Sequence, residues 1–205
     1  LTPHHREALC HVEYGLSAAK PITVLIGEAG TGKSTLLRAA IASEMCRNVT
    51  CVFLNNPTLT RAEFFQVLAA RMGLPSDPGR SKASLLAELE KIVRERQARD
   101  EITALVVDEA HALPDELLEE IRLLANLETP TRKLLPVVLA GQPELAQRLN
   151  EPRLRQLKQR IALRCELRRL DLAETAAYIA SRIRTAGGDP ARLFTREAVT
   201  LIYEH

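Results

Sequence analysis

Short apolar runs, rich in β-branched residues, recur along the chain and alternate with longer amphipathic segments. The runs ITVLIG, VTCVFL, ITALVV and PVVLA occupy residues 22–27, 49–54, 102–107 and 136–140, and a weaker run, IALRCEL, occupies 161–167. Runs of this length that are apolar at nearly every position are typical of strands in a parallel sheet covered on both faces. The pattern therefore predicts an α/β fold with a parallel sheet.

The segments between these runs have helical periodicity and recognisable helix starts. Thr60 precedes RAEFF, and Glu63 follows it three residues later, which is the spacing of a capping box. Pro114 suits the first turn of the helix after the third strand. We expect helices at roughly 33–47, 60–72, 81–98, 114–125 and 143–160.

The last part of the chain has a different pattern. Residues 75–80, PSDPGR, predict a loop within the first domain, but from Asp171 onward the pattern is helical only and is interrupted by a Gly-Gly pair. These features predict an α/β domain over residues 1–170 and a partial helical domain over 171–205. Because the chain begins in LTPHHREAL and stops at LIYEH, we expect it to be a piece of a longer protein.

Composition narrows the class of protein. The chain has 205 residues, 46% of them apolar, and its 28 Lys plus Arg nearly balance its 26 Asp plus Glu, for a net charge of +2. A protein whose whole surface binds nucleic acid would be more basic, although a local basic stripe is compatible with this balance. No segment has the ~20 uninterrupted apolar residues of a membrane helix, and no signal peptide opens the chain.

The four cysteines show no metal-binding spacing. We interpret them as reduced, mostly buried thiols of a cytosolic protein, with a disulfide between Cys46 and Cys51 as the disfavoured alternative.

Residues 27–34 read GEAGTGKS and match the pattern G-x-x-x-x-G-K-[ST] at every required position. Such a loop curls around a phosphate with its N–H groups pointing inward, and the following helix directs its positive end at the same phosphate. Lys33 is expected to reach the β- and γ-phosphates of ATP, and the Ser34 hydroxyl to ligate Mg²⁺. The predicted nucleotide-binding residues are Gly27, Glu28, Ala29, Gly30, Thr31, Gly32, Lys33, Ser34 and Thr35.

Two acids follow the third predicted strand, at the sheet edge where ligands of α/β proteins gather. Asp108 is expected to hold Mg²⁺ through water, and Glu109 to polarise the water that attacks the γ-phosphate. His111 completes the letters DEAH, which also occur in a class of helicases. A helicase of that class needs two such α/β domains, so we treat His111 as incidental to helicase chemistry, although it could report the nucleotide state to a neighbour.

The order of these motifs resembles an AAA+ ATPase. More specifically, several segments resemble the ATPase domain of the general secretion pathway protein A family. They are HREAL at 5–9, GEAGTGKSTLLRA at 27–39, NNPTLT at 55–60, LANLET at 124–129, and VVLAGQPELAQRL at 137–149 followed by LRQLKQRI. This ExeA-type family is related to pilus-biogenesis ATPases of the MshM kind. The resemblance covers essentially the whole chain.

The resemblance implies a P-loop NTPase fold with sheet order 5-1-4-3-2, a helical lid after residue 170, and ring-type homo-oligomers with ATP between subunits. It implies a γ-phosphate sensor role for Gln142 and an arginine-finger role for Arg160, with Arg153 and Arg155 as rivals. Asn55 or Asn56 could hold Glu109 inactive through a hydrogen bond. Members of the family continue into a second sensor arginine, a membrane span and a peptidoglycan-binding domain, none of which this chain contains.

These features imply a Mg-dependent ATPase at the cytoplasmic face of the inner membrane that drives assembly of an envelope secretion or pilus apparatus. Its partner would be an inner-membrane protein of the ExeB type. One alternative is a DNA-associated AAA+ protein of the transposition-regulator type, because 153–169 contains many arginines. Another is a nucleotide-gated switch with little turnover, against which Glu109 argues.

Overall fold

The computed structural model describes residues 2–55, 59–74, 81–130 and 132–204. Apart from the first two residues, the chain divides into two compact units, Pro3–Leu167 and Arg168–His205. The predicted loop at 75–80 lies outside the described residues.

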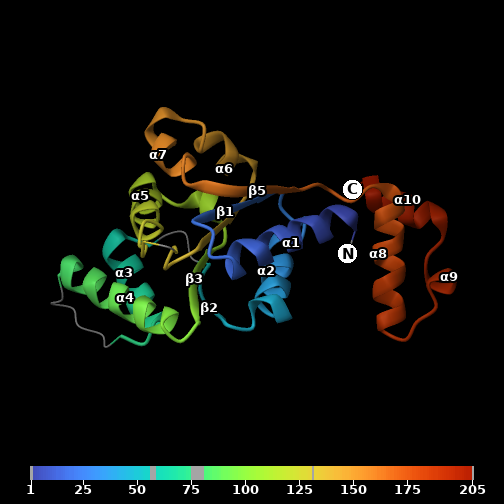
Figure 1. Cartoon of the computed structure of the whole chain (residues 1–205). Coiled ribbons are helices and arrows are strands. Elements are labelled where there is room, and N and C mark those ends of the chain that lie inside the picture. Colours follow the sequence, from blue (N-terminus) through green and yellow to red (C-terminus); the bar gives the residue numbers. More distant parts are fainter. Residues whose placement is uncertain (1, 56–58, 75–80, 131, 205) are drawn as a thin grey trace. The chain divides into compact units, whose positions relative to one another are not determined.

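The first unit is built on a five-stranded sheet in which every paired neighbour is parallel. Its strands are β1 (Ile22–Gly27), β2 (Val49–Leu54), β3 (Ile102–Val107), β4 (Val137–Gly141) and β5 (Ile161–Leu167), in the order β2-β3-β4-β1-β5. This order is the predicted 5-1-4-3-2 read from the other edge, so the fold-class prediction is confirmed (Figure 1). The fourth strand begins one residue later than predicted, after Pro136, which has no N–H to donate to a ladder.

One face of the sheet is covered by α1 (Pro3–Ser17) and α2 (Lys33–Ile41). These helices pack Val12, Leu16 and Leu37 against Val106 and Val138, and all five side chains are buried. The sequence pattern did not predict α1, whose apolar positions are separated by histidines and other polar residues. This helix completes the three-layer α/β/α arrangement.

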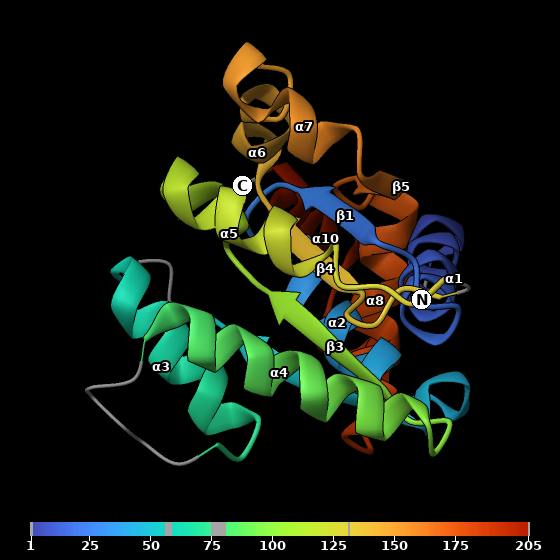
Figure 2. The same cartoon turned by 60° about the vertical axis from the view of Figure 1, so that its left-hand side comes forward.

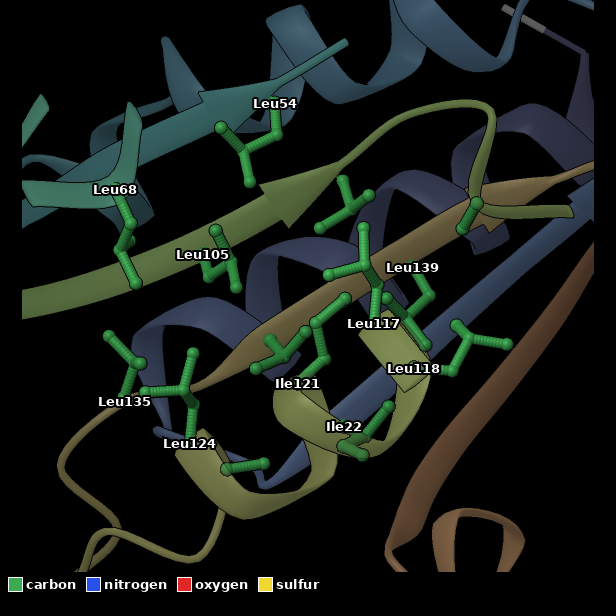
Figure 3. Close-up of a cluster of buried hydrophobic side chains, with 14 of the residues drawn as sticks. Ile22, Leu54, Leu68, Leu105, Leu117, Leu118, Ile121, Leu124, Leu135 and Leu139 are labelled. Carbon is green, nitrogen blue, oxygen red and sulfur yellow. The ribbon is translucent and has the colours of Figure 1, made fainter. Parts of the chain in front are cut away.

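The opposite face is covered by α3 (Arg61–Arg71), α4 (Lys82–Gln97), α5 (Asp115–Leu124), α6 (Pro143–Arg148) and α7 (Arg155–Lys158) (Figure 2). Leu117, Leu118 and Ile121 of α5 lie against Leu105 of β3 and Leu139 of β4 in the larger of the two cores (Figure 3). Leu105 and Val107 face this core, whereas Ala104 and Val106 face the α1 side. This alternation explains why the strands read as continuous apolar runs.

Several predicted helix bounds change in the structure. The segment 33–47 is α2 followed by the separate 3₁₀ turn η1 (Glu44–Cys46), and 143–160 is broken into α6, η3 (Pro152–Leu154) and α7. Pro152 accounts for the separation of α6 from η3, because a proline cannot continue a helix from the residues before it. The capping box of Thr60 and Glu63 is confirmed, whereas Pro114 occupies the N-cap of α5 rather than its first turn.

The four cysteines are free, as expected, but only Cys46 and Cys165 are buried; Cys51 is half-buried and Cys10 is exposed. Burial raises the pKa of the Cys51 and Cys165 thiols to about 12 in each case.

The second unit is helical, with α8 (Leu172–Thr185), α9 (Pro190–Leu193) and α10 (Arg196–Glu204). Asp171 and Glu174 form a capping box at the start of α8, and Gly187 follows its end with φ of +80°. None of these three helices has a fully buried residue. Across the described part of the chain, no helix has both the length and the apolar character needed to cross a membrane.

Candidate nucleotide-binding site

The glycine-rich segment joins the carboxyl end of β1 to the first turn of α2. Gly30 and Gly32 have φ values of +78° and +90°, in the left-handed region that side chains with a Cβ rarely adopt. At Gly27 the constraint is space, because a Cβ would lie 2.6 Å from Thr31 Oγ1 and 3.1 Å from Leu167 Cβ. The glycines of the predicted motif are therefore required by the geometry of the loop.

Lys33 lies folded back over this loop. Its Nζ donates to the carbonyl oxygens of Gly27 at 2.8 Å and Glu28 at 2.9 Å, and the residue is only 5% exposed. Thr31 braces the same bend, because its hydroxyl donates to the Glu28 carbonyl at 2.8 Å. The ammonium group is thus held over the loop, where a triphosphate oxygen can replace a carbonyl as its acceptor.

Ser34 and Asp108 are joined directly, although 74 positions separate them in sequence. The Ser34 hydroxyl donates to Asp108 Oδ2 at 2.6 Å, and the Glu109 N–H donates to Asp108 Oδ1 at 3.0 Å. Asp108 is 6% exposed, and its N–H donates to the Leu54 carbonyl at 2.8 Å. Because the strands are parallel, the carboxyl ends of β1 and β3 lie on the same side of the sheet, separated by the one strand β4.

These two residues fit a magnesium ion. Mg²⁺ prefers oxygen ligands and keeps several waters, and in nucleotide sites it takes few protein ligands beside the phosphates. A hydroxyl and a carboxylate 2.6 Å apart at the phosphate loop supply that limited donor set. Among the described residues there is no cluster of three or more His, Cys, Asp or Glu side chains that could hold a metal by itself.

Glu109 adopts a left-handed conformation, with φ of 55° and ψ of 33°. Ala19 and Asp100 also have positive φ, but both follow the ends of helices, where this conformation is common. Glu109 instead separates β3 from a 3₁₀ turn, η2 (Ala110–Ala112), that the sequence did not predict. Its Oε2 lies 3.6 Å from His111 Nε2, so the sharp turn brings the acid and the histidine together.

Gln142, at the carboxyl end of β4, meets the same histidine. The Gln142 N–H donates to His111 Nδ1 at 3.4 Å, and the side-chain Nε2 lies 3.3 Å from His111 Nε2. The close approach needs Gly141, since a Cβ there would lie 3.1 Å from the His111 nitrogen of the main chain. The structure therefore brings Glu109, His111 and Gln142 together. From the sequence, His111 was interpreted as incidental to helicase chemistry, with a role in reporting the nucleotide state to a neighbour left open.

Arg160 is exposed and immediately precedes β5, at the amino end of the sheet. The phosphate loop lies at the carboxyl ends of the strands, so Arg160 and the nucleotide site of its own chain are at opposite ends of the strands. Arg153, in contrast, pairs within its own chain with Asp115 at 2.7 Å and Glu151 at 2.5 Å. Arg155 is exposed at the start of α7.

Asn55 is exposed at the carboxyl end of β2, and Asn56 lies outside the described residues. One contact to the loop was not predicted from the sequence: His5 Nε2 of α1 lies 3.0 Å from the Thr31 carbonyl. The motif HREAL had drawn attention to this segment only as part of a family resemblance.

A lysine-bearing glycine loop between a strand and a helix, with a serine and an aspartate joined beside it, defines an α/β protein of the P-loop class. A family model described as an AAA domain matches residues 17–149. The chain belongs to this AAA domain family.

Among curated proteins, the chain is 37% identical over 187 residues to general secretion pathway protein A of Aeromonas hydrophila. The match covers 91% of this chain and 34% of that protein, so the chain spans about a third of the length of this relative. The recognition of this family from the sequence is confirmed.

Solved structures show the same fold at low identity. Cdc6p of Pyrobaculum aerophilum is 20% identical with a TM-score of 0.72, covering 90% of this chain and 50% of that one. The Aeropyrum pernix ORC2 protein, solved as ADPNP and ADP complexes, is 17% identical with a TM-score of 0.65, covering 90% and 52%. At these identities the likeness concerns the fold alone.

Proposed function

We propose that this chain binds ATP together with Mg²⁺ and hydrolyses the γ-phosphate. The observation that carries the proposal is the 2.6 Å hydrogen bond between Ser34 and Asp108. Ser34 directly follows Lys33, whose ammonium group is held over the glycine loop. Ser34 and Asp108 would hold a magnesium ion at the phosphates, and the ion would supply positive charge to offset the negative charge that develops during transfer. The chain's own residues supply the rest of the site.

Each side chain has a distinct task in this proposal. Lys33 exchanges its carbonyl acceptors for phosphate oxygens, and the N–H groups of the loop and of the first turn of α2 bind the same phosphates. Glu109 takes a proton from the attacking water, and Gln142 binds the γ-phosphate from the neighbouring strand end. Positioning and charge stabilisation carry most of phosphoryl transfer, so one well-placed carboxylate suffices.

A Glu109→Gln variant tests hydrolysis separately from binding. The amide cannot accept the proton, so phosphate release should fall by about 10²–10⁴-fold, the usual contribution of a general base. Binding of a fluorescent ATP analogue should stay close to wild type. Equal hydrolysis by both proteins would instead support the nucleotide-gated switch with little turnover.

We further propose that ATP turnover drives assembly of an envelope secretion or pilus apparatus through ring-type oligomers. The similarity to general secretion pathway protein A supports the role in secretion. The position of Arg160 supports the ring, because this residue is exposed at the amino ends of the strands, away from its own nucleotide site. From there Arg160 could reach the ATP of a neighbouring subunit. In this proposal residues 171–205 are part of the lid, and an inner-membrane protein of the ExeB type is the partner.

An Arg160→Ala variant tests the arrangement between subunits. ATP binding should be unchanged, whereas hydrolysis stimulated by assembly should fall by about 10³-fold or more, as for other arginine fingers. Arg47→Ala is a matched control, because among the described residues the ion pair of this exposed arginine is the local one with Glu44, three residues away. A normal stimulated rate in Arg160→Ala would assign the finger to another arginine.

Ion pairs among the described residues argue against the DNA-associated alternative. Arg153 and Arg164 of the basic segment pair with carboxylates of their own chain, which lowers the local positive charge. DNA binding through phosphates would weaken steeply as salt rises. A fluorescence-anisotropy titration with duplex DNA at low and moderate salt should therefore show no binding of that kind.

A further inference from the structure

Arg148 joins two segments that flank the candidate site. From the last turn of α6 its Nη1 donates to the His111 carbonyl at 2.5 Å, and its Nη2 donates to Asp115 Oδ1 at 2.5 Å. The first acceptor is in η2 and the second is in the first turn of α5. A planar guanidinium can hold both acceptors in one fixed geometry, which a lysine ammonium cannot reproduce.

This contact is well enclosed. The Arg148 side chain is only 19% exposed, and the His111 side chain 18%. Asp115 is anchored from its other side, because Arg153 Nη1 lies 2.7 Å from its Oδ2. Arg148 therefore does not act as a mobile surface cation, and the carbonyl of His111 has a defined partner.

The His111 imidazole stands between the proposed base and the proposed sensor. Its Nδ1 accepts from the Gln142 N–H, so we assign its proton to Nε2, which lies 3.6 Å from Glu109 Oε2. The Gln142 side-chain amide lies 3.3 Å from the same Nε2, and with this tautomer its oxygen, after an amide flip, is the atom that accepts. A rotation of the η2 turn would move this imidazole relative to both side chains. The Arg148 contact to the His111 carbonyl opposes such a rotation.

We infer that Arg148 is a positioning residue of the proposed ATPase site, acting through His111 to hold Glu109 and Gln142 in register. The inference rests on the proposed function for its catalytic consequence, but its structural consequence can be measured without nucleotide. It predicts that loss of the guanidinium displaces the imidazole and slows the chemical step while ATP binding is retained.

Arg122 provides a matched control. It also lies in a helix beside the same core, its side chain is 13% exposed, and it makes two hydrogen bonds to one carboxylate, Glu119, at 2.8 and 2.7 Å. Those bonds stay within α5. Arg122→Met therefore removes a comparable guanidinium without touching the η2 turn, and Arg148→Met removes the proposed positioning contact.

The first measurement is the imidazole signals of the nucleotide-free chain in a ¹H–¹³C correlation spectrum. The chain has 5 histidines, and the His111→Ala variant assigns the signal of His111. That signal should move in Arg148→Met and stay in place in Arg122→Met. A His111 signal that is unchanged in Arg148→Met would overturn the inference, even if the chain is an active ATPase.

The second measurement is steady-state hydrolysis. Arg148→Met should lower kcat by about 10–100-fold, the scale of a misplaced catalytic group, and leave the KM for ATP within about twofold. Added to His111→Ala it should have no further effect beyond about twofold, because residues that act through one another are not additive. Arg148→Lys should recover only part of the activity.

These measurements distinguish failure of the positioning role of Arg148 from failure of the proposed ATPase function. A raised KM with an unchanged kcat, or an equal loss of kcat with and without His111, would assign Arg148 a general structural role and refute the inference. If the unmodified chain neither binds nor hydrolyses ATP, the proposed function fails. The histidine spectrum would still decide whether Arg148 positions His111.

Discussion

Replacing Asp108 by Asn should stabilise the nucleotide-free protein and remove its response to MgATP. Asp108 is 6% exposed, and its hydrogen-bond donors are the Ser34 hydroxyl and the Glu109 N–H. Within the described residues no Lys, Arg or His forms an ion pair with it. A carboxylate buried in this way retains a desolvation penalty of several kcal/mol, on the order of 3–5.

An asparagine preserves both contacts, because Oδ1 still accepts from Glu109 and the amide donates to the Ser34 oxygen. Each bond loses about 1 kcal/mol when its acceptor is no longer charged. The remaining gain is about 1–3 kcal/mol, which raises Tm by about 2–12 °C for a chain of this size. The wild type should overtake the variant when MgATP is present at about 1,000 times its Kd, which adds about 4.1 kcal/mol.

The assay is thermal unfolding of both proteins by circular dichroism, with and without MgATP. A matched control is Asp100→Asn just before β3, because this exposed aspartate makes only a long surface pair with Arg132 among the described residues, and its loss should leave both curves nearly unchanged. An Asp108→Asn variant that melts below the wild type in the absence of nucleotide would refute the reasoning on burial. A variant that gains as much from MgATP as the wild type would remove Asp108 from the metal site.

Two further predictions concern stability and thiol chemistry. Glu120 of α5 is 2% exposed and pairs with Arg61 and Lys82. The double variant Arg61→Met with Lys82→Met leaves this carboxylate buried and unpaired, so the free energy of unfolding in urea should fall by about 3–5 kcal/mol, whereas Glu120→Leu should change it by no more than about 1 kcal/mol. Equal losses in the two proteins would contradict this asymmetry. Burial raises the pKa of the Cys165 thiol to about 12, so little of its reactive thiolate forms at pH 8. Iodoacetamide at pH 8 should therefore alkylate exposed Cys10 and spare Cys165. Mass spectrometry of the native protein checks the second prediction, and rapid labelling of Cys165 at pH 8 would contradict it.

The strands and the phosphate loop were predicted from local sequence because their signals are local. A strand buried on both faces is apolar throughout, and the glycine-lysine spacing of the loop has few alternatives in structure. The strand order was implied only by family resemblance, and the contact of Ser34 with Asp108 depends on that order.

The parts that the sequence missed depend on tertiary contacts. The α1 helix packs Ala8, Val12 and Leu16 into the core, but its sequence has no clear apolar face. The η2 turn begins directly after Glu109, whose left-handed conformation is not indicated by the local sequence. The meeting of His111 with Gln142 and Arg148 joins residues 31 and 37 positions apart. No pairwise spacing in the sequence indicates such contacts.

Binding of ATP by Lys33 can be measured by calorimetric titration of ATP into the chain in the presence of Mg²⁺, compared with the Lys33→Ala variant. We expect the wild type to bind one ATP per chain and the variant to lose about 100-fold or more in affinity, because charge-assisted contacts to the phosphates are among the strongest in the site. We also expect weaker wild-type binding when EDTA removes the metal. Equal affinity of the two proteins for ATP would contradict the proposed nucleotide site.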